Sequence, residues 1–159
     1  MVGMAGIRHR VRVVRSIWRT LYHARVRTPI NLRRNASRVD RWLDIGPGDD
    51  PVSGFEVLDV TASPTTDYVL DATKPLPFQD GTFRLVHASH VLEHVPWFET
   101  EGVLREWARL VAPGGWLEIW VPDGYKLANL LVNLSDGIDD GSWRDGWRVR
   151  GADRNGYVW

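Results

Sequence analysis

The fold is decided by the stretch Trp42-Leu43-Asp44-Ile45-Gly46-Pro47-Gly48-Asp49-Asp50, in which a mostly apolar run ends abruptly in glycines. Residues 42–45 predict a buried strand, and Gly46 and Gly48 predict a loop directly after it. Because glycine has no Cβ, such a loop can turn through positive φ and bring backbone N–H groups against a ligand. Asp44, at the end of the predicted strand, could accept a hydrogen bond from an amine of that ligand. A plain turn between two strands would explain this stretch equally well, so the rest of the chain has to decide.

Length and composition indicate one domain with a core of its own. The chain has 159 residues, of which 43% are hydrophobic, and this is enough for one core but not for two. It contains no cysteine, which excludes disulfides and thiolate metal sites and fits a reducing compartment. We therefore expect a cytoplasmic protein. No apolar run is long enough to span a membrane.

The formal net charge of zero hides a division of charge along the chain. Residues 1–41 hold 11 arginines and a single acid, whereas 9 basic and 19 acidic residues follow from Trp42 onward. Within the basic part, apolar residues at helical spacing predict an amphipathic helix from Arg8 to Arg27 that ends before Pro29. Residues 28–38 are expected to form a polar linker. The apolar residues of the predicted helix are Val14, Ile17, Trp18, Leu21 and Tyr22.

A basic amphipathic helix of this kind has three plausible uses. It could lie on an anionic membrane surface or contact the phosphates of a nucleic acid. It could also pack its apolar stripe on the protein's own body while its arginines meet the acidic surface, which is the expectation that needs no partner. An arm left in solvent is a further alternative, and an Arg-rich, acid-poor start also resembles an organelle transit peptide.

Acids also stand at the ends of the next two predicted strands. Residues 55–60 predict a strand with Asp59 near its end, and residues 67–70 predict one that is followed by Asp71. In a doubly wound sheet ligands lie at the carboxyl ends of the strands, and an acid at the end of the second strand can bind both hydroxyls of a ribose. The competing interpretation is that these acids only cap turns.

The later segments complete an α/β pattern. A largely apolar strand is predicted at residues 83–88, followed by a helical turn, a helix at 100–111, a strand at 116–121 and a helix at 125–134. The link between the first two strands is unusual, because only residues 49–54 separate the glycine loop from the second strand. The usual crossover helix there must be very short or replaced by a loop.

Four segments in this order resemble the class I S-adenosylmethionine-dependent methyltransferases, in particular the small type-11 methyltransferase domains. They are LDIGPG at 43–48, VLDV at 57–60, DATKPLPFQDGTFRLVHASHVLEHV at 71–95 and LVAPGGWLEIWVPD at 110–123, and together they span about half of the chain. The resemblance implies a Rossmann-like, mainly parallel sheet with the strand order 3-2-1-4-5. It also implies S-adenosylmethionine as the cofactor and methyl transfer to an acceptor, most simply a small molecule.

The resemblance also implies where each part of the cofactor would lie. The cofactor already carries an activated methyl group, so the protein mainly aligns the acceptor and removes a proton where the acceptor requires it. His90 is the candidate for that proton transfer. The implied residues are Asp44, Gly46 and Gly48 for the methionine end, Asp59 for the ribose, Asp71 and Ala72 for the adenine, and Ser89 and His90 near the sulfonium.

The tract from His90 to His94 also matches the His-x-x-Glu-His order of zinc ligands in inverzincin peptidases. Two histidines four residues apart on a helix could bind one metal ion. The tract lies where the methyltransferase resemblance places it, however, and no separate carboxylate ligand is marked. We therefore expect no metal, and we expect Glu93 and His94 to fix the start of a helical turn by hydrogen bonds.

The chain departs from the family pattern at two places. Asp50 replaces the third glycine of the loop, which weakens the expected contact with the carboxylate end of the cofactor. The family usually has two more strands after the fifth, whereas only a tail rich in Gly, Asp and Trp follows here, with a short strand expected around residues 157–159. Either the sheet is reduced or the sequence is a truncated version of a longer protein. The expected divisions are an arm and linker at 1–41, a methyltransferase-like domain at 42–134 and a tail at 135–159.

Two other functions remain open at this stage. A domain of the same fold could be non-catalytic and serve as an interaction module through its arm. A nucleic-acid methyltransferase guided by the arginines would bind in a strongly salt-dependent way. The acidic body and the absence of an Asn-Pro-Pro-Tyr-like tetrapeptide favour a small-molecule acceptor over the latter.

Overall fold

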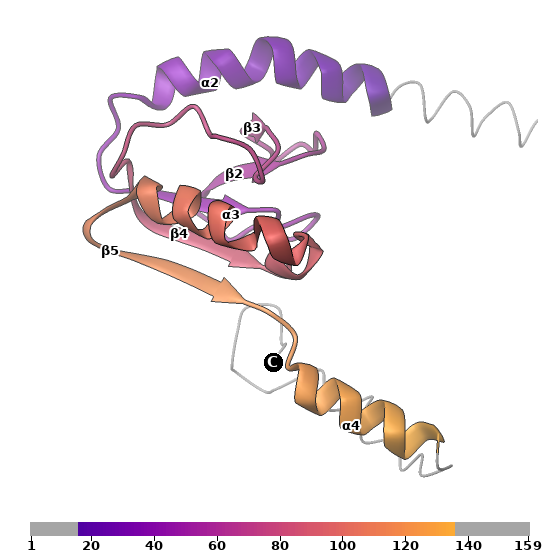
Figure 1. The fold of residues 1–159 in the computed structure, drawn as a ribbon. Coiled ribbons are helices and arrows are strands. Elements are labelled where there is room, and N and C mark those ends of the chain that lie inside the picture. The colour runs from indigo at the N-terminus through magenta and orange to yellow at the C-terminus, as the bar shows by residue number, and fades with distance from the viewer. Residues whose placement is uncertain (1–15, 136–159) are drawn as a thin grey trace, which may run out of the picture.

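The computed structural model describes residues 16–135, which contain one five-stranded parallel sheet (Figure 1). The strand order is β3-β2-β1-β4-β5, with every neighbouring pair parallel, which confirms the predicted order and class of sheet. The short strand expected around residues 157–159 lies outside the described residues. The strands are β1 Arg41–Ile45, β2 Glu56–Asp59, β3 Tyr68–Val69, β4 Phe83–Ser89 and β5 Val111–Trp120.

Helix α3 (Trp97–Leu110) covers one face of the sheet (Figure 1). Its buried side chains are Val103, Trp107 and Leu110, which join the apolar side chains of β1 and β4 in a single core. Trp107 is completely buried, and its indole N–H donates to the Ala72 carbonyl at 3.0 Å, so the polar atom of this large side chain is satisfied. The helix begins three residues earlier than expected, directly after Pro96, and a second helix, α4 (Gly124–Ser135), follows β5.

The opposite face of the sheet is only partly covered: Trp42 on β1 and Trp116 on β5 are exposed, whereas Asp44 and His87 at its centre are buried or half-buried. Side chains alternate along a strand, so Trp42 and Trp116 point away from the core, and Trp116 is 74% exposed. Right-handed crossovers that run in opposite directions along a sheet lie on opposite faces. A helix between β1 and β2 would therefore cover this face, but residues 46–55 form a loop of turns instead, as the short link predicted.

The prediction of a polar linker at residues 28–38 is wrong, because the N-terminal helix continues to Asn35. Residues 16–22 are helical, a π-helical segment η1 (His23–Arg27) follows, and α2 (Thr28–Asn35) completes the helix. In a regular α-helix the ring of Pro29 would clash with the carbonyl four residues earlier. The Thr28 N–H instead bonds to the His23 carbonyl five residues back, and this wider turn accommodates the proline. Residues 8–15 of the predicted helix lie outside the described residues.

The helix lies along the β3 edge of the sheet and packs through polar side chains (Figure 1). Thr28 Oγ1 accepts the Val69 N–H at 2.9 Å, and Asn31 donates to the Asp67 carbonyl at 2.9 Å. The side chains of the predicted apolar stripe that lie in the described part, such as Trp18 and Tyr22, are exposed. The expectation that the stripe packs on the body is therefore wrong: the helix is held by the hydrogen-bonding capacity of its other face.

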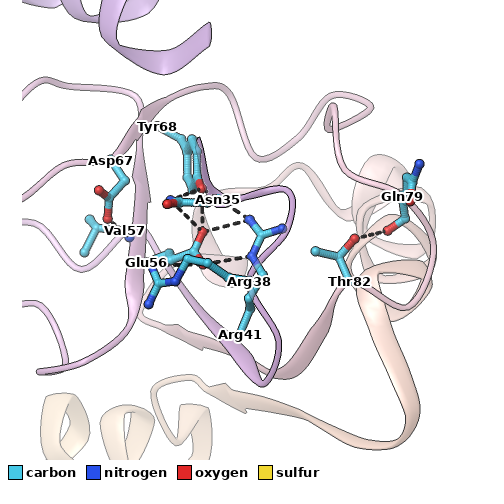
Figure 2. Close-up of polar contacts among 9 residues, drawn as sticks. All are labelled: Asn35, Arg38, Arg41, Glu56, Val57, Asp67, Tyr68, Gln79 and Thr82. Carbon is cyan, nitrogen blue, oxygen red and sulfur yellow. Dashed lines mark hydrogen bonds and ion pairs between the residues drawn. The ribbon is translucent and has the colours of Figure 1, made fainter. Parts of the chain in front are cut away.

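A buried polar cluster fixes the end of α2 to the sheet (Figure 2). Arg41 binds Glu56 through two hydrogen bonds of 2.8 Å, and Asn35 donates to the Tyr68 hydroxyl at 2.8 Å. The Tyr68 hydroxyl in turn donates to Glu56. Burial alone would raise the pKa of Glu56, but the hydrogen bonds from Arg41 and Tyr68 outweigh it and lower the pKa. Burial and the bond to Glu56 raise the pKa of Tyr68 far above its ordinary value.

The start of β5 is irregular, in agreement with the Pro-Gly-Gly signal that precedes the predicted strand. Phe83 is the register partner of Val111, whereas Leu85 is the partner of Trp116, so residues 112–115 bulge out of the ladder. A Cβ on Gly115 would lie 2.6 Å from the Arg84 carbonyl oxygen, which explains the need for glycine at this close approach.

Candidate functional site

The topology of the sheet places the candidate site at the carboxyl ends of the strands. From β1 the chain runs to β2 and β3 on one side, and then to β4 and β5 on the other, so the strand order reverses between β1 and β4. In open α/β sheets this switch point is the usual place for a ligand. Because all strands are parallel, the segments that follow β1, β2, β3 and β4 emerge at the same edge.

The glycine loop after β1 has the predicted backbone conformation. Gly46 and Gly48 have φ angles of +64° and +60°, and the Gly46 N–H donates to the Leu58 carbonyl at 2.8 Å. A Cβ on Gly46 would lie 2.6 Å from Val91 Cγ2, so the loop packs directly on the segment after β4. A Cβ on Gly48 would meet nothing within 4 Å. The backbone at Gly48 is therefore open to a ligand, whereas Gly46 serves close packing.

Asp44 has partners within the protein and not the open position expected for a ligand-binding carboxylate. It is only 1% exposed, and its Oδ2 accepts the Val52 N–H at 2.8 Å. Its Oδ1 lies 2.8 Å from Nδ1 of His87. Asp44 thus ties the loop after β1 to β4, which differs from the predicted contact with a ligand amine.

His87 is a residue of this site that sequence reasoning missed. It is the register partner of Asp44 on β4, and its ring lies edge-on to Phe55 with 6.2 Å between the ring centroids. Burial alone would lower the pKa of His87, but the hydrogen bond and negative charge of Asp44, with a contribution from Glu118, outweigh it and raise the pKa. The available signal was a histidine inside an apolar strand, since a buried imidazole needs a partner.

Asp59 and Asp71 adopt the same local structure at the ends of neighbouring strands. Oδ1 of Asp59 accepts the N–H and hydroxyl of Thr61 at 2.8 and 2.9 Å, and Oδ1 of Asp71 accepts the same groups of Thr73 at 2.9 and 2.7 Å. The hydrogen bonds from Thr73 lower the pKa of Asp71. Within residues 16–135, Oδ2 of each aspartate has no hydrogen-bond partner. Each acid therefore caps a turn with one oxygen and could accept a hydrogen bond with the other; the shared Asp-x-Thr spacing was a signal in the sequence.

Ala72, which follows Asp71, belongs to the core. Its side chain is buried with the apolar residues around α3, and its carbonyl accepts the Trp107 N–H. The structure thus brings Asp71 to the site edge but turns the Ala72 side chain inward. The side chain of Ala72 therefore cannot make the predicted contact with adenine.

The segment after β4 brings Ser89 and His90 to the same edge. Ser89 ends β4, and His90 has φ +60°, a left-handed conformation that is uncommon for residues other than glycine and often marks functional sites. Nδ1 of His90 lies 2.9 Å from Glu93 Oε1, which confirms that Glu93 fixes this turn by a hydrogen bond. The turn is η2 (Leu92–His94), and the N–H of His94 donates to the Val91 carbonyl at 3.1 Å. Within residues 16–135 no group of three or more potential ligands could hold a metal ion.

The middle of the chain matches a known family. Residues 55–119 match the family model described as a methyltransferase domain. This segment is thus similar to a methyltransferase domain. The match confirms the family predicted from the four sequence segments, and the matched part contains Asp59, Asp71 and His90. The glycine loop lies just before the matched part of the methyltransferase domain.

Several solved structures are similar to part of this chain. The PH0226 protein from Pyrococcus horikoshii OT3 shares 25% sequence identity with this chain, with a TM-score of 0.48 over 70% of this chain and 63% of that one. The trans-methyltransferase CalH, crystallised with SAH, shares 25% identity, with a TM-score of 0.39 over 74% of this chain and 41% of that one. The DhpI–SAM–HEP complex shares 20% identity, with a TM-score of 0.43 over 77% of this chain and 67% of that one.

The chain therefore spans less than two thirds of the length of PH0226 and of CalH. No curated protein is similar enough in sequence to count as a match.

The side chains at the carboxyl ends of the strands determine what this site can bind. The open oxygens of Asp59 and Asp71 can accept hydrogen bonds from hydroxyl or amine donors, and their negative charge suits a cationic ligand. Nδ1 of His90 faces Glu93, and Nε2 of the same ring is buried. The site thus offers two carboxylates that can bind a ligand, with one imidazole nearby.

Proposed function

We propose that this protein binds S-adenosylmethionine at the carboxyl edge of the sheet and transfers its methyl group to a small-molecule acceptor. The single observation that carries the proposal is the arrangement of Asp59, whose Oδ1 is fixed by Thr61 while Oδ2 has no partner among residues 16–135. A carboxylate held in this way at the end of the second strand suits the two hydroxyls of a ribose. The methyltransferase-domain match supports the same reaction class.

The residues present fit such a cofactor at three places. The open backbone at Gly48 would approach the methionine end, Asp59 the ribose and Asp71 the adenine. When bound, the cofactor supplies a methyl group on a sulfonium, which is already activated for transfer. The buried Asp44 would hold the loop in place from below, through the Val52 N–H.

The protein's part in the transfer itself would be alignment and proton removal. Ser89 ends β4 and His90 follows it at the switch point, and both would line the floor near the methyl group. Glu93 orients the His90 ring through Nδ1. Nε2 is buried in this structure, so it would have to become accessible in order to take the proton from an acceptor that must lose one. The sequence without cysteine supports a cytoplasmic location for this reaction.

The test is calorimetric titration of S-adenosylmethionine and S-adenosylhomocysteine into the full chain. We expect micromolar binding that falls about 10- to 100-fold in Asp59→Ala, the usual range for hydrogen bonds to a charged group. Asp80→Ala is the matched control, because Asp80 is an exposed acid that lies just before the amino end of β4, away from the carboxyl ends of the strands. Equal loss in both variants, or no binding to the folded wild-type chain, would contradict the proposal.

A non-catalytic interaction module is the second candidate. The exposed apolar stripe of the N-terminal helix favours it, because a surface of this kind fits a binding partner. Radiolabelled methyl transfer to a pool of small molecules separates the two functions. Labelled product that disappears in His90→Ala supports catalysis, whereas tight cofactor binding without product supports the module.

A further inference from the structure

The outward face of the N-terminal helix is a continuous apolar stripe, which we call the helix stripe. Trp18 and Tyr22 are 69% and 57% exposed, and the neighbouring aliphatic side chains extend the stripe along the helix. A single exposed apolar side chain is ordinary, but a contiguous row marks an interaction site. The stripe consists of Ile17, Trp18, Leu21, Tyr22, Val26 and Ile30.

The opposite face of this helix is already occupied by the protein. Thr20, Thr28 and Asn31 make hydrogen bonds to backbone groups of the body, at Ala62, Val69 and Asp67. The helix is therefore anchored in a fixed orientation by its polar side. No rotation can bury the helix stripe on the body without breaking these bonds.

The helix is also strongly basic. Residues 16–35 contain five arginines and no acid, and all five are exposed. Within residues 16–135 none of these five guanidinium groups forms an ion pair. Their positive charge calls for an anionic partner outside the described part of the chain. The five are Arg19, Arg25, Arg27, Arg33 and Arg34.

We infer that this helix docks the protein on an anionic phospholipid surface. Basic helices with Trp and aliphatic residues on one face lie in the membrane interface, with the apolar face among the upper acyl chains and the cations at the phosphates. Trp18 and Tyr22 are suited to the depth of the lipid headgroups, where the apolar rings contact acyl chains and the N–H or O–H group stays hydrated. The inference is independent of methyl transfer.

The charge and the stripe together favour lipid over two other partners. Nucleic acid would satisfy the arginines, but it would leave the helix stripe in water. A second copy would cover the stripe, but it would bring five arginines against five more. The helix would lie on the surface rather than cross it, and no helix in residues 16–135 is long and apolar enough to span a bilayer.

The experiment is sedimentation of the full chain with vesicles of phosphatidylcholine alone or mixed with phosphatidylserine. We expect binding to the mixed vesicles, weaker binding at higher salt, and little binding to phosphatidylcholine. The double variant Trp18→Ser/Tyr22→Ser should lose at least tenfold in partitioning, because both rings insert. Arg25→Gln and Arg33→Gln should each weaken binding about fivefold, the effect of about 1 kcal/mol per cation near the surface.

The chain offers a matched control in Trp97 and Phe98, which begin α3 and are 85% and 68% exposed. Trp97→Ser/Phe98→Ser removes a comparable aromatic pair and should leave vesicle binding unchanged. Unchanged circular dichroism would confirm that all variants fold, as expected for exposed side chains. Equal binding to both kinds of vesicle, or to neither, would overturn the inference.

Two further outcomes would assign the helix to another partner and would also overturn the inference. Duplex DNA or RNA that binds with a steep salt dependence, and equally well in Trp18→Ser/Tyr22→Ser, would point to nucleic acid. A concentration-dependent dimer in light scattering without vesicles, lost in the same double variant, would point to a second copy.

Discussion

The pair formed by His87 and Asp44 joins the sheet to the glycine loop. Asp44 is nearly completely buried, and its two oxygens hold His87 Nδ1 and the Val52 N–H. Within residues 16–135 a loop stands where a helix would connect β1 to β2, and the side chain of Asp44 fixes the backbone of this loop. Losing the partner of a buried carboxylate leaves a charge without compensation.

We therefore expect His87→Val to destabilise the protein by about 3 kcal/mol, the lower end for breaking a buried pair. His87→Asn places an amide N–H near the position of Nδ1 and should recover much of that loss. Urea denaturation measures both effects, and the exchange of the Val52 amide with solvent should accelerate in the valine variant first. A valine variant as stable as wild type would show that Asp44 does not depend on His87.

The pH dependence of this pair has a defined sign. The pKa of His87 is raised above its ordinary value of 6.5, so its contribution to stability is fully present below pH 6.5. It is lost as the pH rises through the pKa of the folded state. Wild type should show this decline in urea titrations at stepped pH, and His87→Asn, which cannot titrate, should not.

Gly46 and Gly48 share a positive φ but differ in their surroundings, which separates two effects. Gly46→Ala should cost about 2–4 kcal/mol, from left-handed backbone strain plus the clash with Val91. Gly48→Ala should cost only the strain, about 1–2 kcal/mol. Thermal unfolding measures both, and Val91→Ala should relieve part of the loss in the Gly46 variant but none in the Gly48 variant. Equal losses in the two alanine variants would argue against close packing at Gly46.

At the scale of one element, the N-terminal helix depends on a buried histidine. Neither ring nitrogen of His23 has a hydrogen-bond partner among residues 16–135. Burial, and the positive charges of Arg27 and Arg19, lower the pKa of His23 below 6.5, although Asp67 opposes this. The unfolded or detached helix therefore gains a proton before the docked helix does.

We expect the docking of this helix to weaken as the pH falls below 6.5, the ordinary pKa of the imidazole. The Val69 amide, which donates to Thr28, reports docking through its exchange rate with solvent. Its protection should fall in acid for wild type and stay level in His23→Leu, apart from the intrinsic pH dependence of exchange. Constant protection in wild type would mean that His23 is not neutral in the docked state.

At the scale of the whole molecule, the polar cluster around Glu56 holds the helix and three strands together. Asn35, Arg41 and Tyr68 come from α2, β1 and β3, and all bind this one carboxylate on β2 (Figure 2). Because the pKa of Glu56 is lowered from 4.5, its contribution is present above that pH and is lost as the pH falls through the folded value.

Glu56→Gln should therefore destabilise the fold by about 3–5 kcal/mol at neutral pH, because the buried Arg41 loses its counter-charge. The same variant should show a flatter loss of stability in acid than wild type. Chemical denaturation between neutral and acid pH measures both effects. Glu101→Gln is the control, because Glu101 forms an exposed pair with Arg105. An equal effect in the control would refute a special role for the cluster.

The sequence was enough to predict the strands, because their apolar runs are local and their turn residues are distinctive, whereas the strand order came from the resemblance to a methyltransferase family. It was not enough to orient the N-terminal helix. An apolar stripe is normally buried, but here Thr28 and Asn35 bind β3, and Asn31 binds the carbonyl of the residue just before β3. Pro29 predicted the end of the helix, but the π-helical turn before it allows the helix to continue. The partner of Asp44 lies 43 residues away, a tertiary contact that no local pattern reveals.

The loop that replaces a helix between β1 and β2 also bears on how the chain folds. Arg41 on β1 and Glu56 on β2 are only 15 residues apart, whereas Asp44 and His87, which join β1 to β4, are 43 apart. Closing the shorter segment loses less chain entropy, so this parallel pair can form before the centre of the sheet is complete. Stopped-flow kinetics should then give Leu58→Ala a larger effect on the folding rate, relative to its effect on stability, than Val86→Ala. The shortened link would make β1 and β2 the nucleus on which the other strands assemble.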